Sequence, residues 1–214
     1  MKTDVRHTAL EALEKLREGN QRFVDADRCV DTYLSHTRLD EHLEGQSPFA
    51  IVLGCSDSRV PVEIIFDVGV GDLFVIRVAG NVIAPSLVGS IEFAAERFGS
   101  RLVVVLGHTG CGAIEATIDS LQANDDSGSE NIQDIVGRIR PAVEHLVREA
   151  PAEARENVLN QAVRANVVAN VNALENASKV LERLIRDQGL VIVGAEYSLA
   201  TGQVDFFNGI PEHG

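Results

Sequence analysis

Two short stretches of the chain place metal-ligating and charged side chains close together. Cys55, Asp57 and Arg59 lie within five positions, and His108 and Cys111 lie within four. Zinc takes Cys and His ligands, and a catalytic site with two Cys and one His keeps the fourth position for water. Cys55, His108 and Cys111 therefore form a candidate Zn²⁺ site with the composition of a catalytic centre.

Both stretches follow a predicted buried strand. Residues 51–53 are an apolar run that stops at Gly54, and residues 102–106 are another that stops at Gly107. Parallel sheets keep their chemistry at the carboxyl ends of such strands. Taken alone, either stretch is better explained by ordinary buried thiols and a loop histidine than by a metal site. The two together, each at a strand end, favour the metal site.

The two stretches resemble the signatures of the β-class carbonic anhydrases, Cys-x-Asp-x-Arg and His-x-x-Cys. Cys55-Ser56-Asp57-Ser58-Arg59 matches the first and His108-Thr109-Gly110-Cys111 matches the second, 53 positions later (108 − 55). The resemblance extends through residues 16–23, 72–77 and 194–197, and so covers nearly the whole chain. It implies an enzyme in which zinc-bound hydroxide attacks CO₂ to give bicarbonate.

The resemblance also implies roles for individual residues. In the family, the residue matching Asp57 accepts a hydrogen bond from the zinc-bound hydroxide, and the residue matching Arg59 holds that carboxylate away from the metal. Gln46 resembles a substrate-contacting Gln of the plant-type members, and Gly112 is assigned to substrate binding with it. We expect two thiolates to leave zinc a weaker acidifier of water than three histidines would.

Two other functions fit the same residues. In a structural zinc or redox protein, Asp57 would complete a closed four-ligand site and leave no position for water. A carbonyl sulfide or carbon disulfide hydrolase would use the same ligands, as relatives of the family do. Turnover of CO₂ compared with its sulfur analogues distinguishes these possibilities.

Composition and net charge limit the binding partners and the cellular location that we expect. The 214 residues are 45% hydrophobic, which suits one domain over residues 1–214. A net charge of −13 argues against nucleic acid or an anionic membrane surface as a partner. No apolar stretch is long enough to cross a membrane, and we expect a cytoplasmic protein. Three cysteines make disulfides unexpected, and Cys29 lies outside the candidate site.

The remaining pattern predicts an α/β fold: a mostly parallel central sheet of four strands with an antiparallel edge strand and helices on both faces. Strands are predicted at 51–53, 73–78, 102–106, 190–193 and 204–207. Helices are predicted at 8–23, 61–65, 86–98, from 113, at 132–148 and at 159–185. We expect Gly19-Asn20 to mark the end of the first helix, Ser86 to cap the third, and Pro141 to kink or divide its helix.

Regulation and assembly are also predicted from the resemblance. Family members inhibited by bicarbonate hold it with a Trp, an Arg and a Tyr; the aligned residues here are Val52, Arg77 and Phe93, so we expect no such inhibition. Arg77 is instead expected to form an ion pair at a subunit interface. A homodimer or homotetramer is expected, with the helix within residues 1–24 packing on a partner subunit.

Overall fold

A five-stranded sheet forms the centre of the molecule in the computed structural model, which describes residues 7–27, 29, 43, 45–123, 128–149, 151 and 154–211. Its strand order is β2-β1-β3-β4-β5, and only the β4–β5 pair is antiparallel. The strands are β1 (Ala50–Gly54), β2 (Leu73–Arg77), β3 (Leu102–His108), β4 (Val191–Tyr197) and β5 (Val204–Asn208). This arrangement confirms the predicted fold class.

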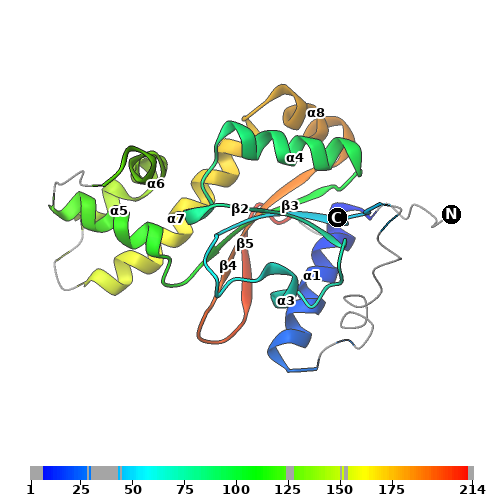
Figure 1. The fold of residues 1–214 in the computed structure, drawn as a ribbon, viewed down its shortest axis with the longest axis horizontal. Helices are drawn as coiled ribbons and strands as arrows, with labels where there is room; N and C mark the ends of the chain where they lie inside the picture. The colour runs from blue at the N-terminus through cyan, green and yellow to red at the C-terminus, as the bar shows by residue number, and fades with distance from the viewer. Residues whose placement is uncertain are drawn as a thin grey trace.

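Helices cover both faces of the sheet (Figure 1). One face packs on α1 (Ala9–Val24) and the short α3 (Val62–Ile65), and the other packs on α4 (Pro85–Arg97), α7 (Arg155–Glu175) and α8 (Lys179–Gln188). Alternate residues of β1 divide between the two cores, with Val52 on the α1 side and Ile51 and Leu53 on the α4 side. Every residue of β1 and β3 is buried, as expected for central parallel strands.

A third apolar cluster lies beyond the carboxyl ends of the strands. It joins α5 (Gly112–Ala123), α6 (Glu130–Glu149) and the first half of α7, and it includes Cys55 and Cys111. The candidate thiols therefore lie where the sheet meets this helical layer, away from bulk water. Among the described residues, no helix combines the length and apolar character that a membrane crossing requires.

The first helix does not end at Gly19-Asn20 but continues to Val24. A Cβ at position 19 would lie 1.9 Å from the carbonyl oxygen of Phe66, so glycine is needed there for close packing. Asn20 is buried; its amide donates to the carbonyls of Ile65 and Gly202, and its Oδ1 accepts from the amide of Val204. Both residues connect α1 to the rest of the fold. The apolar stripe of α1 also packs on its own domain, with Leu16 fully buried.

Three other boundary predictions were wrong. The predicted helix 159–185 is two helices, because Ser178 caps a new one by accepting from the amide of Leu181; Leu174 and Leu181 share one core, so the apolar spacing continues across the break. Ser86 does not cap α4, which begins at Pro85, a residue suited to a first helical position. Pro141 does not divide α6, which runs unbroken through it.

Candidate metal centre and active site

The register of β1 and β3 brings the two predicted ligand stretches to one edge of the sheet. Gly54, the last residue of β1, pairs with Leu106 of β3. Cys55 and His108 follow this pair along their strands, so both lie at the carboxyl end of the sheet. Cys111 follows in the turn before α5. The Sγ atoms of Cys55 and Cys111 and a ring nitrogen of His108 all lie within 4.8 Å of one another, and the three residues are at most 4% exposed.

His108 is oriented as a metal ligand by its neighbour. Its Nδ1 lies 3.0 Å from the carbonyl oxygen of Thr109, which can only accept a hydrogen bond, so Nδ1 carries the proton. Nε2 is then left with a lone pair, and it is buried without a hydrogen-bond partner. A buried nitrogen of this kind is costly unless something binds it. The donor set and this orphaned atom together fit a zinc ion.

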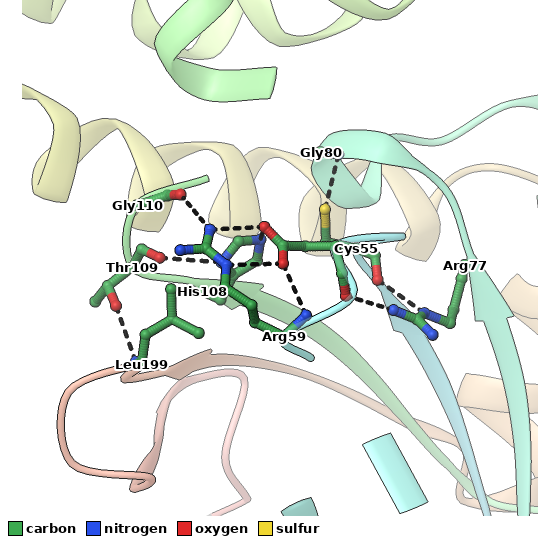
Figure 2. A network of polar contacts seen from close by, with 9 residues as sticks. Cys55, Arg59, Arg77, Gly80, His108, Thr109, Gly110 and Leu199 are labelled. Atoms are coloured by element: carbon green, nitrogen blue, oxygen red, sulfur yellow. Dashed lines mark hydrogen bonds and ion pairs between the residues drawn. The ribbon is translucent and has the colours of Figure 1, made fainter. Parts of the chain in front are cut away.

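Thr109 is itself fixed by the segment that follows β4. Its amide donates to the carbonyl of Tyr197. Its Oγ1 accepts from the amide of Leu199 (Figure 2). The carbonyl that orients His108 is therefore held from a part of the chain about 90 positions away. Thr109 occupies a variable position of the His-x-x-Cys signature, so the sequence pattern does not indicate this role.

The two thiols differ in acidity because they share hydrogen bonds. The pKa of Cys55 is lowered, first by a hydrogen bond from Cys111 and also by hydrogen bonds from backbone amides. The pKa of Cys111 is raised, because its thiol donates to Cys55 and because it is buried. The amide of Gly80 is one of the backbone groups that donate to Cys55, and its nitrogen lies 3.4 Å from Cys55 Sγ. The site thus already favours a thiolate at Cys55, the form that binds metal.

Asp57 and Arg59 form a two-pronged ion pair beside the donor cluster (Figure 2). Arg59 Nε donates to Asp57 Oδ1 at 3.0 Å and Nη2 donates to Oδ2 at 2.7 Å, while the Arg59 amide also donates to Oδ1. Nη2 makes a further bond to the carbonyl of Gly110. These bonds hold the pKa of Asp57 well below its usual range. Asp57 Oδ2 lies 3.9 Å from His108 Nε2, next to the cluster but bonded to Arg59.

The sequence model of the carbonic anhydrase family matches residues 50–204, which include strands β1 to β4 and the clustered residues Cys55, His108 and Cys111. The crystal structure of the β-carbonic anhydrase CafA of Aspergillus fumigatus superposes with a TM-score of 0.73 at 26% identity, covering 85% of each chain. The chain belongs to the β-carbonic anhydrases.

Curated relatives of this β-carbonic anhydrase carry the same enzyme name. It is 38% identical to carbonic anhydrase 2 of Mycobacterium tuberculosis over 192 residues, covering 90% of this chain and 89% of the relative. It is 37% identical to the carbonic anhydrase of Mycolicibacterium smegmatis over 194 residues, covering 91% of each. The β-carbonic anhydrase CcaA superposes with a TM-score of 0.70 at 27% identity, covering 94% of this chain and 92% of that one. The protein is a carbonic anhydrase enzyme.

The three positions aligned with a bicarbonate pocket do not meet in this carbonic anhydrase. Val52 faces the α1 side of the sheet, whereas Phe93 packs against Phe74 and Phe98 on the α4 side and is 54% exposed. Arg77 donates instead to the backbone carbonyls of Cys55 and Asp57 (Figure 2). In this chain Arg77 therefore stabilises the turn that carries Cys55 and Asp57.

The two predicted substrate-binding residues lie differently. Gln46 is exposed and precedes β1, so it lies at the opposite end of that strand from Cys55. Gly112 is the exposed first residue of α5, directly after Cys111, and a Cβ there would meet nothing within 4 Å. Their assignment to substrate binding stays a prediction, and a single chain does not bring Gln46 to the site.

Proposed function

We propose that this carbonic anhydrase catalyses the zinc-dependent, reversible hydration of CO₂ to bicarbonate and a proton. One observation carries the proposal: two thiols and one imidazole converge in a buried cluster while the adjacent carboxylate of Asp57 is bonded to Arg59. Cys55, His108 and Cys111 would hold the ion, and three protein ligands leave one tetrahedral position for water. When bound, Zn²⁺ would act as a Lewis acid that makes water nucleophilic near neutral pH.

The protein residues would orient the attacking water. Asp57 keeps its carboxylate because Arg59 lowers its pKa, so Oδ2 can accept a hydrogen bond from the water without taking its proton. With that hydrogen atom fixed, the oxygen lone pair is directed toward the carbon of CO₂. The new C–O bond gives bicarbonate, and one proton leaves to the medium. Arg59 acts through Asp57, and the Gly110 carbonyl helps to fix Arg59 in place.

The closed-site alternative requires Asp57 as the fourth ligand. Both carboxylate oxygens are already engaged by Arg59, and this pairing argues against a structural zinc site. No observation favours a sulfur analogue of CO₂ over CO₂ itself.

We further propose one domain over residues 1–214 that works as a cytoplasmic homodimer or homotetramer. Fold likeness supports assembly: the β-carbonic anhydrases of Sordaria macrospora, 23% identical with a TM-score of 0.69, are described as tetrameric. Because Gln46 lies at the far end of β1, it would reach substrate only in the site of a second subunit. The helix within residues 1–24 would use its outward residues for that contact, among them Leu10, which is 39% exposed.

Stopped-flow measurement of CO₂ hydration tests the function. The zinc-loaded protein is compared with protein stripped by a chelator and then reloaded, and carbonyl sulfide and carbon disulfide are run in parallel. We expect hydration to be lost on stripping and restored by zinc. A zinc-loaded protein with no activity on CO₂ would refute the proposal, and turnover of only the sulfur compounds would assign the site to them.

A further inference from the structure

Two buried asparagines on α7 form a hydrogen-bonded relay that ends beside the candidate metal centre. Asn170 Nδ2 donates to the backbone oxygen of Asn166 at 2.9 Å and to its Oδ1 at 3.2 Å. Asn166 Nδ2 donates to the carbonyl of Gly80 at 2.9 Å. The exposed fraction is 1% for Asn166 and 9% for Asn170. Burial of a side-chain amide is costly unless it is hydrogen-bonded, as both of these are.

The orientation of both amides follows from their partners. The backbone oxygen of Asn166 can only accept, so the Asn170 side chain must direct its NH₂ group there. That NH₂ also faces Asn166 Oδ1, which fixes the Asn166 oxygen on the Asn170 side. The Asn166 NH₂ group is then directed at the Gly80 carbonyl, another atom that can only accept. Each bond in the relay therefore determines the direction of the next.

Gly80 connects this relay to Cys55. Its amide donates to Cys55 Sγ, as Figure 2 shows, while its carbonyl is held by Asn166. The backbone at Gly80 has φ +68°, and a Cβ there would lie 2.8 Å from Ile139 Cδ1 and 3.1 Å from the Cβ of Ala113. A side chain at position 80 would be strained in this left-handed conformation, so glycine is suited to it. Glycine also gives the backbone more conformational freedom than any other residue would. The bond from Asn166 restricts that freedom.

We propose that Asn166 is a positioning residue for the metal ligand Cys55, acting through the Gly80 peptide and itself oriented by Asn170. The inference rests on the metal site of the proposed function. Groups that orient metal ligands affect metal affinity by about 10- to 100-fold, and the effect of Asn166 is expected near the lower end because it acts through one intervening peptide.

The test replaces Asn166 with Leu, which keeps the approximate size and removes both polar atoms. The matched control is Asn172→Leu, the same substitution on an exposed position of the same helix. Three quantities are measured on the full chain: zinc affinity by chelator competition, melting temperature with and without zinc, and the thiolate-to-metal absorption band of the Co²⁺-substituted protein.

Asn166→Leu should lower zinc affinity about tenfold relative to Asn172→Leu, reduce the rise in melting temperature on adding zinc, and shift the Co²⁺ absorption band. A merely structural role predicts equal losses of melting temperature with and without zinc and an unchanged affinity, and that result overturns the inference. If Asn166→Leu does not fold, Asn166→Asp decides on the same measurements, since it places an acceptor against the Gly80 carbonyl. A wild-type chain that does not bind zinc would instead refute the proposed function.

Discussion

Arg77 Nη2 donates to the backbone carbonyl of Asp57 at 2.6 Å, and its Nε donates to the carbonyl of Cys55 at 2.9 Å. One guanidinium at the end of β2 thus holds two carbonyls of the turn that presents both a candidate metal ligand and the carboxylate beside it. The fork geometry of arginine suits two acceptors at fixed separation, and lysine cannot reproduce it.

Arg77→Lys should therefore lower kcat/KM for CO₂ hydration by roughly 10- to 100-fold, because small displacements of Asp57 misorient the attacking water. Zinc content should stay near that of the wild type, since no ligand atom is removed. Stopped-flow kinetics with zinc analysis on the same samples checks both expectations. Unchanged kinetics would mean that the turn keeps its shape without the guanidinium.

Removal of any one of the three clustered donors should reduce the bound zinc. Cys55→Ser, His108→Ala and Cys111→Ser each delete one ligand atom, and a tetrahedral site does not hold zinc tightly with only two protein ligands. Cys29→Ser is the matched control, because Cys29 is a cysteine outside the cluster. Elemental analysis of the purified chains measures the outcome. Full zinc retention in all three cluster variants would contradict the site.

The sequence was sufficient to predict the buried strands at 51–53 and 102–106 and the functional residues that follow them. An apolar run ended by glycine is a local signal of such a strand. The structure adds that β1 and β3 pair in parallel, which places Cys55 and His108 at the same end of the two strands. The break between α7 and α8 was missed because Leu174 and Leu181 lie on either side of it and pack in one core. The spacing of apolar residues shows which face of a helix is buried, but it does not show whether the helix is continuous.

The supporting contacts were not predictable, because they join distant parts of the chain. Gly80 contacts Cys55 from 25 positions away, and Asn166 contacts Gly80 from 86 positions away. A weak signal for the second was present: Asn166 and Asn170 are spaced four apart among Val163, Val167 and Val171, where polar residues interrupt a buried face. The spacing indicates that the pair shares a face but not which carbonyl it contacts.

Asp57→Asn should lower kcat/KM by roughly 100-fold while zinc is retained. The amide that replaces the carboxylate carries a donor group, so it cannot accept from water and from Arg59 with both of its terminal atoms. Asp134→Asn is the matched control, because Asp134 forms a similar two-pronged pair with Arg138 on the exposed side of α6. Equal kinetics for the two variants would make the Asp57–Arg59 pair a structural feature only.

Hydration activity should rise from mildly acidic to alkaline pH, because the attacking water must lose a proton. Asp57 does not set this rise: Arg59 holds the pKa of its carboxyl low, and a group with a lowered pKa loses its charge only at still lower pH. Arg59→Ala should return the pKa of Asp57 toward the ordinary value of about 3.9. The variant should then lose additional activity at the acid end, where wild type keeps Asp57 ionised. Rate profiles measured over a range of pH values at constant ionic strength test this, and a flat wild-type profile would rule out deprotonated water as the nucleophile.

Bicarbonate should inhibit this enzyme only as an ordinary product, without sigmoidal dependence on its concentration. A separate bicarbonate site would need several donors around one anion, because desolvating the anion is costly unless hydrogen bonds replace its water. Val52 is fully buried on the α1 side of the sheet, Phe93 lies on the opposite side, and Arg77 already donates to two carbonyls. Initial rates at fixed pH and ionic strength with rising bicarbonate should give a hyperbolic loss. A sigmoidal loss that disappears in Arg77→Lys would show instead that the guanidinium leaves the turn to bind the anion.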